Sequence, residues 1–262
     1  METILNVKEL TMDFGGLRAL DHLDMDVNQG EIVALIGPNG AGKTTFFNCI
    51  TGIYAPTKGD ILLMSPDGKC QRINGLKPNH VTEKGMARTF QNIHLFPNMT
   101  VLENVMIGRH CRTVSGIAGA IFRTGKTLEE EKQVAERSYT LLEKVGLESF
   151  VNALAKNLPY GAQRRLEIAR AMATEPFLLL LDEPAAGMNP LETNELDELI
   201  VDIRDKEHIS ILLIEHDMKL VMSLSDRIFV MDYGKKIAQG TPDEIRNNPA
   251  VIKAYLGEDI DA

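Results

Sequence analysis

The chain has 262 residues, of which 44% are hydrophobic and 25% are charged, a composition typical of a soluble globular protein with one large α/β domain or two small ones. Its net charge of −9 argues against broad electrostatic binding to nucleic acid, which needs a basic surface, so we expect no nucleic-acid partner. No apolar run approaches the roughly 18 residues that span a bilayer. Any role at a membrane would therefore require partner proteins.

The first part of the chain predicts an antiparallel β flank followed by a buried strand. Apolar and polar residues alternate through residues 4–28, and this period of two is typical of half-exposed strands. The apolar run at 32–36 predicts a buried strand, and residues 44–50 predict a helix. Residues 59–64 predict a further strand that ends before a turn at 66–68.

The turn between the buried strand and the first helix fits the phosphate-binding pattern G-x-x-x-x-G-K-[ST]. Glycines allow backbone N–H groups to converge on phosphate oxygens, and the helix N-terminus adds unpaired donors and a positive dipole end. Lys43 would contact the β- and γ-phosphates, and the Thr44 hydroxyl would bind Mg²⁺. The predicted nucleotide-binding residues are Gly37, Pro38, Asn39, Gly40, Ala41, Gly42, Lys43, Thr44 and Thr45.

The middle of the chain has a different, helical pattern. Residues 127–130 form a capping box that predicts a helix start at Thr127, and Gly146 is the predicted C-cap. The apolar positions of this helix fall on one face: Val134, Leu141, Leu142 and Val145. The apolar stretch at 115–122 could be core or a surface that faces a partner.

Two unbroken apolar runs follow, at 177–181 and 209–214, as expected of parallel strands that are buried on both faces. The first run leads into Asp182 and Glu183, at the carboxyl end of a strand, where α/β sheets bind ligands. Asp182 would hold Mg²⁺, and Glu183 would be the general base that orients the attacking water. The alternative is a pair of acids that opens a helix. Residues 241–244 predict one more helix start.

The order and spacing of further motifs resemble the ATP-binding cassette (ABC) ATPases over almost the whole chain. The resemblance places Gln91 in the family's Q-loop, as a contact for Mg²⁺ and water, and His216 in the H-switch, as a γ-phosphate contact. Phe14 stands where the family places an aromatic ring on adenine. Structural alternatives remain open, with Gln91 as a surface amide, His216 as a satisfied neutral histidine and Phe14 as a core residue.

Residues 158–163 occupy the place of the family's signature motif, so the resemblance implies that Pro159, Tyr160 and Gly161 face the nucleotide of a partner subunit. The family's L-S-G-G-Q is L-P-Y-G-A here, and Pro159 has neither a hydroxyl nor an N–H group. Proline suits the first position of the following helix, so donors near Gly161 could still face phosphate. Asn189 replaces the usual D-loop aspartate. We therefore expect turnover that is slower, or more dependent on partners.

The resemblance implies an α/β fold of the ABC ATPase type. Its P-loop NTPase core is a mostly parallel sheet flanked by helices, with an antiparallel β flank and an inserted α-helical subdomain. One nucleotide-binding domain would span 1–262, with the core at 1–91 and 164–262 and the helical subdomain at 92–163. The cofactors implied are ATP and Mg²⁺, and the reaction is ATP hydrolysis. The basic residues at 109–112 and 164–165 are expected to be solvated charge.

A closer resemblance is to the ATPases of branched-chain amino acid importers, through residues 13–17, 47–52, 87–91, 184–187 and 248–257. It implies a second ATPase subunit, either a copy or a paralogue, and two membrane-spanning permease subunits at the cytoplasmic face of the cell membrane. A solute-binding protein would take part indirectly. The alternatives are an ATPase for urea, amide or other solute uptake, a soluble ABC ATPase that acts on DNA or the ribosome, and a non-hydrolysing regulatory cassette.

Overall fold

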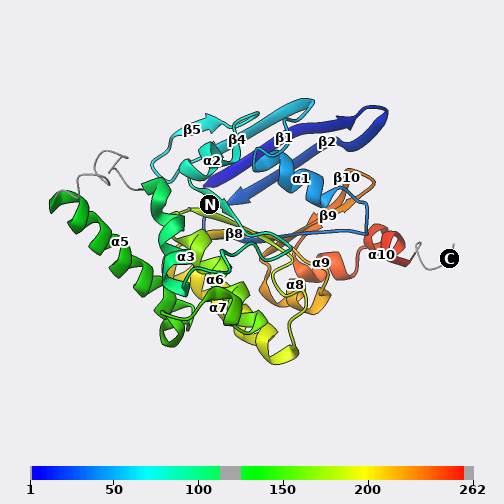
Figure 1. Ribbon diagram of the computed structural model, residues 1–262. Coiled ribbons are helices and arrows are strands. Elements are labelled where there is room, and N and C mark those ends of the chain that lie inside the picture. Colours follow the sequence, from blue (N-terminus) through cyan, green and yellow to red (C-terminus); the bar gives the residue numbers. More distant parts are fainter. Residues whose placement is uncertain (1, 113–124, 257–262) are drawn as a thin grey trace.

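Two β-sheets form the centre of the molecule, and Figure 1 shows the smaller sheet lying over the larger one, with most helices on the opposite side. The computed structural model describes residues 2–112 and 125–256. The smaller sheet is antiparallel and contains β1 (Thr3–Phe14), β2 (Leu17–Asn28), β4 (Lys58–Met64) and β5 (Cys70–Arg72), in the order β2-β1-β4-β5. This sheet confirms the antiparallel flank predicted from residues 4–28.

The larger sheet is mostly parallel, as predicted. It contains β3 (Ile32–Ile36), β6 (Met86–Arg88), β7 (Leu178–Asp182), β8 (Ser210–Ile214), β9 (Arg227–Asp232) and β10 (Lys235–Gly240), in the order β10-β9-β3-β8-β7-β6. All neighbouring strands are parallel except β9 and β10. Every residue of β3, β7 and β8 is buried, which explains their unbroken apolar sequences.

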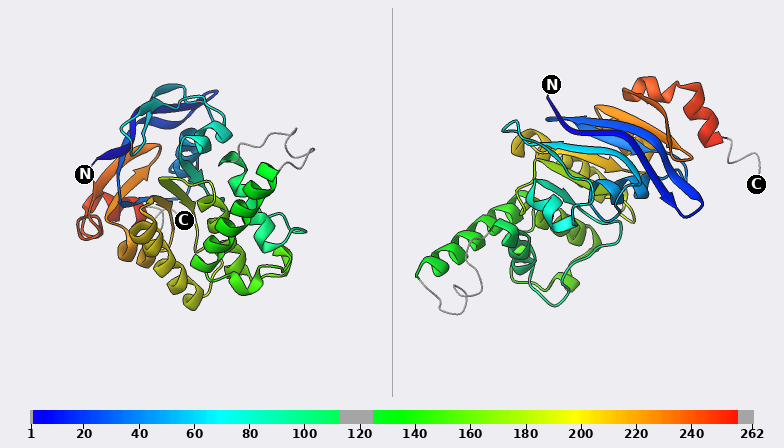
Figure 2. Two further views of the ribbon diagram at one scale, coloured as in Figure 1. Left: turned by 90° about the vertical axis from the view of Figure 1, so that its left-hand side faces the viewer. Right: turned by 90° about the horizontal axis from the view of Figure 1, so that it is seen from above.

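Helices surround the larger sheet. The α-helices are α1 (Lys43–Ile50), α2 (Pro78–Glu83), α3 (Val101–Gly108), α5 (Gly125–Lys144), α6 (Tyr160–Met172), α7 (Pro190–Glu207), α8 (Met218–Leu224), α9 (Pro242–Arg246) and α10 (Pro249–Leu256). Short 3₁₀ turns are η1 (Arg109–Arg112), η2 (Glu148–Phe150) and η3 (Ala155–Asn157). Helix α3 packs against α5 and α6, and Figure 2 shows α5 reaching away from the sheets. The division of the chain at residues 92–163 stays a prediction.

The larger sheet separates two hydrophobic cores, and the side chains of β3 alternate between them. Ile32, Ala34 and Ile36 belong to the core that the sheet forms with α6, α7 and α8, whereas Val33 and Leu35 belong to the core with α1 and the smaller sheet. Because β3 packs against a hydrophobic core on each face, the loop that leaves its carboxyl end begins from a rigid position. The phosphate-binding pattern starts at that point.

The carboxyl ends of four neighbouring strands meet at one edge of the larger sheet. Strands β3, β8, β7 and β6 are parallel and lie side by side in this order. The residues that follow them are Gly37, Glu215, Glu183 and Thr89. The topology therefore brings four segments that are far apart in the sequence to one place, which is the position where α/β sheets bind ligands.

Most predicted element ends agree with the structure to within one residue. The N-cap at Thr241 and its capping box with Glu244 are confirmed. Gly146 has a φ of 67° and Leu147 N donates to Leu142 O at 2.8 Å, which confirms the C-cap of α5. Helix α5 begins at Gly125, so the predicted start at Thr127 is wrong by two residues, within the range over which helix ends vary. The apolar stretch at 115–122 lies outside the described residues.

The prediction of solvated charge at the basic clusters is wrong for two arginines. Arg164 has no exposed surface, and the Arg109 side chain is almost fully buried. Each pairs with an acid from a neighbouring turn or loop, Arg164 with Glu167 at 2.9 Å and Arg109 with Glu175 at 2.9 Å. A buried guanidinium is stable only when it is paired in this way.

Among the described residues, no helix is long and apolar enough to cross a membrane.

Candidate nucleotide-binding site

The phosphate-binding loop joins β3 to α1 and packs so tightly that glycines are required. Gly42 occupies the N-cap of α1 with a φ of 100°, and a Cβ there would lie 2.7 Å from Ala19 O. Gly37 has a φ of 153°, and a Cβ would lie 2.1 Å from Met231 O. The pattern's first and last glycines are therefore steric requirements, because β1–β2 and β9 approach the loop directly.

Lys43 lies inside this loop. Its side chain is buried, and Nζ donates hydrogen bonds to the carbonyl oxygens of Gly37 at 2.6 Å and Pro38 at 3.0 Å. The ammonium group is therefore held beside the backbone that would surround the phosphates. Thr44, the next residue, is exposed at the first turn of α1, where helix N–H groups are available to an anion.

A pocket of about 500 Å³ opens beside the loop, within the range of small-molecule sites. Loop residues 39–45 line it together with Gln91, Glu183 and His216. Phe14 lies on its rim, is 41% exposed and makes an edge contact with Tyr54, with ring centroids 5.3 Å apart. Phe14 is therefore not a core residue, and its ring is available to a planar base.

The carboxylate of Glu183 is the centre of the polar contacts in this pocket. Oε2 accepts a hydrogen bond from Gln91 Nε2 at 2.8 Å, and Oε1 lies 2.8 Å from His216 Nε2. Three residues that are far apart in the sequence are thus brought together. The Glu183 backbone has a φ of 48°, the left-handed region, and its N–H donates to Ile214 O at 2.9 Å. Such strain in a non-glycine residue is characteristic of functional sites.

Asp182 precedes Glu183 at the end of β7 and is buried. Its Oδ2 accepts a hydrogen bond from Arg88 Nη2 at 2.6 Å, in an ion pair with the last residue of β6. The sequence predicted Asp182 as a Mg²⁺ ligand but did not single out Arg88 as a partner for it. The sequence signal that could have indicated this partner is Arg88 itself, a charged residue at the end of a short apolar stretch.

Glu215 is a further acid that sequence reasoning passed over. Its side chain is buried, and Oε1 accepts from Ala185 N at 2.8 Å while Oε2 accepts from His216 N at 3.0 Å. Burial raises the pKa of Glu215. Glu215 therefore ties the backbone of the segment after Glu183 to the backbone of His216.

Tyr233 lines the nucleotide pocket and is highly exposed. The sequence did not indicate it, since a single tyrosine in a turn carries no motif.

The residues at the signature position lie at the start of α6, beside other loops of the same chain. Pro159 is the N-cap of α6, so the predicted first helical position is wrong by one residue, and Tyr160 occupies that position. The Tyr160 hydroxyl donates to Ala186 O at 3.0 Å. Gly161 is buried, and a Cβ there would lie 2.7 Å from Glu192 Oε1. Asn189 caps α7, accepting hydrogen bonds from the N–H groups of Leu191 and Glu192.

The donor set suits a magnesium ion that is bound together with a nucleotide. Mg²⁺ prefers oxygen ligands and usually takes one or two carboxylates, with phosphate oxygens and water among its remaining ligands. The Thr44 hydroxyl, the Gln91 amide oxygen and the Asp182 carboxylate are ligands of this kind. Gly37, Gly40 and Gly42 of the loop have positive φ, which is the backbone conformation that a turn of converging N–H groups requires. Magnesium and a nucleoside triphosphate therefore fit the residues present.

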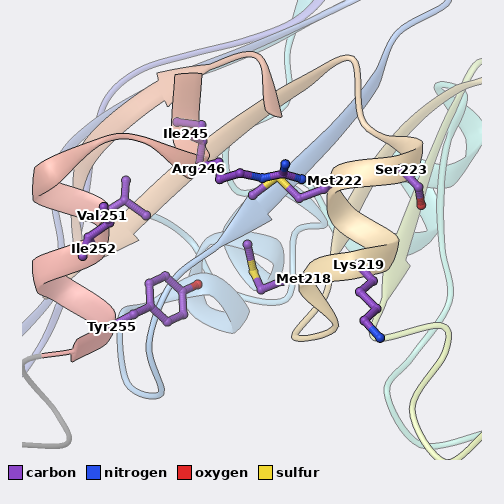
Figure 3. Close-up of a pocket in the computed structure, with 9 residues that line it drawn as sticks. All are labelled: Met218, Lys219, Met222, Ser223, Ile245, Arg246, Val251, Ile252 and Tyr255. Atoms are coloured by element: carbon purple, nitrogen blue, oxygen red, sulfur yellow. The ribbon is translucent and has the colours of Figure 1, made fainter. Parts of the chain in front are cut away.

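A second pocket, of about 720 Å³, lies between α8, α9 and α10 (Figure 3). Its walls are largely apolar, with Met218 and Met222 facing Val251 and Tyr255, and Figure 3 shows Arg246 extending from α9 toward Met222. Among the described residues it has no lining residue in common with the nucleotide pocket. It is therefore separate from the phosphate site, although α8 begins two residues after His216.

The fold and this site define a P-loop cassette that binds and hydrolyses nucleotides. The family model of ABC transporters matches residues 20–186, and a second model, described as branched-chain amino acid ATP-binding cassette transporter, matches residues 235–261. The chain belongs to the ABC transporter family, as one of its ATP-binding cassettes. The predicted class, an ABC-type ATPase with the corresponding fold, is thereby confirmed.

The relatives also bear out the closer resemblance. The chain is 50% identical over 257 residues to the high-affinity branched-chain amino acid transport ATP-binding protein LivG of Escherichia coli, covering 98% of this chain and 99% of LivG. It is 50% identical to BraF of Pseudomonas aeruginosa, covering 97% and 98%. The crystal structure of the ADP conformation of MJ1267, an ATP-binding cassette of an ABC transporter, superimposes with a TM-score of 0.83 at 31% identity, covering 98% of this chain and 100% of MJ1267.

Proposed function

We propose that this chain is the ATPase subunit that energises import of branched-chain amino acids. The observation that carries the proposal is Glu183, whose carboxylate lies between Gln91 and His216 at the mouth of the phosphate loop. The names of the relatives, which are branched-chain amino acid transport proteins, support the choice of solute. We propose further that the chain works at the cytoplasmic face of the cell membrane, against two membrane-spanning permease subunits.

In this proposal Lys43 and the loop N–H groups hold the phosphates of ATP, and Phe14 stacks on adenine. Glu183 accepts a proton from the attacking water while Gln91 orients that water, and His216 holds the γ-phosphate. Thr44, Gln91 and Asp182 would hold a magnesium ion, which would supply positive charge to neutralise the phosphates. Positioning and electrostatics therefore supply most of the catalysis, as in phosphoryl transfer generally.

A second ATPase subunit, a paralogue or a copy, would complete the site. The start of α6, with Pro159, Tyr160 and Gly161, would face the partner's nucleotide, and ATP would join the two subunits. Hydrolysis removes the phosphate that bridges them, so the pair would open, and the helical subdomain at 92–163 would move together with Gln91. A solute-binding protein would deliver the amino acid on the far side of the membrane.

The experiment that tests this function is ATP hydrolysis by the reconstituted transporter in proteoliposomes. We expect leucine-loaded receptor to raise phosphate release and to drive uptake of labelled leucine. Lys43→Ala is the control, because loss of the charge should weaken ATP affinity by about 10- to 100-fold. Stimulation by a different solute would overturn the choice of amino acid alone, whereas an absence of ATP hydrolysis would overturn the proposal entirely.

A further inference from the structure

Arg88 is a buried cation that joins three elements of the nucleotide site. Its side chain is 8% exposed, and Nη2 donates to Asp182 Oδ2 at 2.6 Å. Nη1 donates to Asn48 Oδ1 at 2.8 Å and is 3.2 Å from Thr51 Oγ1. Asn48 lies on α1 and Thr51 is its C-cap. One guanidinium group therefore connects the ends of β6 and β7 to the helix that follows the phosphate loop.

Two aromatic rings hold the plane of this guanidinium. Its central carbon lies 5.4 Å from the ring centroid of Phe47, on α1, and 5.4 Å from that of Phe90. Phe90 immediately precedes Gln91. Arginine can stack and donate in several directions at once, whereas the point charge of lysine cannot. The orientation of Asp182 and the start of the Gln91 segment are thus coupled through one side chain.

The contact fixes the orientation of the Asp182 carboxylate and uses one lone pair of Oδ2. The Asp182 side chain is 5% exposed, and the Arg88 contact leaves more lone pairs on Oδ1 for the cation or for one of its water ligands. Mg²⁺ demands near-ideal octahedral geometry, so a rotated carboxylate would be a poorer ligand. Groups that hold a metal ligand in place often matter nearly as much as the ligand itself.

We propose that Arg88 is a positioning residue for the Mg²⁺–ATP site, which holds Asp182 with Oδ1 toward the cation and links that orientation to α1 and Gln91. The proposal rests on the proposed function, since Mg²⁺–ATP is the substrate it assumes. Two other roles give different outcomes. If the guanidinium charge merely repels the metal, its removal tightens metal binding. If Arg88 only stabilises the fold, its removal lowers stability and leaves metal affinity unchanged.

Arg88→Met tests these roles, because methionine keeps apolar contact with the two rings but has neither the charge nor the donors. Arg88→Lys keeps the charge without the planar fork. Arg109→Met is the matched control: the Arg109 side chain is 7% exposed and pairs at 2.9 Å with Glu175, an acid that is not among the residues proposed to bind nucleotide or Mg²⁺. The measurement is Mn²⁺ binding by electron paramagnetic resonance, with a non-hydrolysable ATP analogue, because Mn²⁺ shares the oxygen ligands and octahedral geometry of Mg²⁺.

We expect Arg88→Met to weaken Mn²⁺ binding by about 10-fold or more, with nucleotide affinity in EDTA unchanged. Arg88→Lys should give an intermediate loss, and Arg109→Met should lose thermal stability without any change in Mn²⁺ affinity. Unchanged or tighter Mn²⁺ binding in Arg88→Met would overturn the positioning role. If that variant does not fold, unchanged Mn²⁺ binding in Arg88→Lys overturns it instead. A wild-type chain that binds no nucleotide would refute the proposed function itself, which keeps the two failures distinct.

Discussion

Two regions of the nucleotide site differ in how closely their residues follow the motifs of the ABC family. The phosphate loop, Glu183 and His216 have the residue types that the chemistry requires, and Glu183 already lies within hydrogen-bond distance of its neighbours. The start of α6 departs from the family at Pro159 and Tyr160. There the Tyr160 hydroxyl contacts Ala186 of the same chain at 3.0 Å. Tyr160 therefore makes an internal contact at the place where, in the proposed function, this chain would face the partner's nucleotide.

Helix α6 also makes hydrogen bonds to the backbone around Gln91. Arg164, one turn after Tyr160 on α6, donates to Phe90 O and Gln91 O at 2.7 Å each. Its partner Glu167 accepts a weaker hydrogen bond from His94 N at 3.3 Å. The backbone around Gln91 is thus attached to α6. Helix α6 therefore joins the region that departs from the family to the region that follows it, and the following variants test how far the two can be separated.

The largest effect is expected for Glu183→Gln. The amide keeps the shape and can still hydrogen-bond to Gln91 and His216, but it cannot accept a proton from water. We expect kcat to fall by about 10²- to 10⁴-fold with ATP affinity retained. ATP-bound dimer should accumulate, which size-exclusion chromatography with ATP would detect. Turnover similar to the wild type in a phosphate-release assay would remove Glu183 from the role of base.

A large loss of stability is expected for Arg164→Met. The change leaves the Glu167 carboxylate buried without its cation, so the free energy of unfolding should fall by about 3–5 kcal/mol. Arg165→Met is the matched control, because Arg165 is partly exposed and pairs with Glu195 at 3.5 Å, a contact worth about 0–1 kcal/mol. Both are measured by denaturant unfolding.

The double variant Arg164→Met with Glu167→Leu separates stability from positioning. Removing both charges should restore much of the stability, since a buried ion pair contributes little net energy. It should not restore turnover, because the Phe90 and Gln91 carbonyls still lack their donor. Recovery of both stability and turnover would show that α6 does not position Gln91.

A smaller effect is expected at the departing residues themselves. Pro159→Ser restores the family's hydroxyl at an N-cap position that serine favours, and we expect steady-state ATP turnover of the assembled transporter to rise a few-fold. Tyr160→Gly should lower stability, because it removes the hydrogen bond to Ala186, which contributes about 1 kcal/mol. Turnover that is unchanged or lower in Pro159→Ser would contradict the view that the departure slows the enzyme.

The sequence predicts the parts of this site that are local and leaves out those that are not. Strand β3, the loop and Glu183 follow from short motifs and apolar runs within a few residues of each other. The Arg88–Asp182 contact joins positions 94 residues apart, and the Arg164–Gln91 contact joins positions 73 residues apart. Neither spacing is periodic, so no local pattern indicates them. Arg164 was predicted to be solvated for the same reason, since only the folded packing reveals its partners.

The smallest expected effect is on stability and depends on pH. It concerns Asp197, whose pKa is affected by Glu215 and Asp217, the two neighbours of His216 in the sequence. Asp197, on α7, is partly buried, its Oδ1 has no hydrogen-bond partner among the described residues, and it faces Glu215 and Asp217. Burial, with the charges of Asp217 and Glu215, raises the pKa of Asp197 from 3.8 to about 6. The native state therefore binds this proton more tightly than the unfolded chain does. It follows that this group reduces stability as pH rises from about 4 to about 6, and the reduction persists above pH 6.

Asp197→Asn removes this penalty while keeping the shape of the side chain. Allowing for solvent screening, we expect the variant to be more stable than the wild type by about 1 kcal/mol at pH 8, with the difference disappearing near pH 4. Glu198→Gln is the control, since Glu198 is exposed on the same helix. Denaturant unfolding at the two pH values measures the difference. An equal gain at both pH values would mean that ionisation of Asp197 is not its cause.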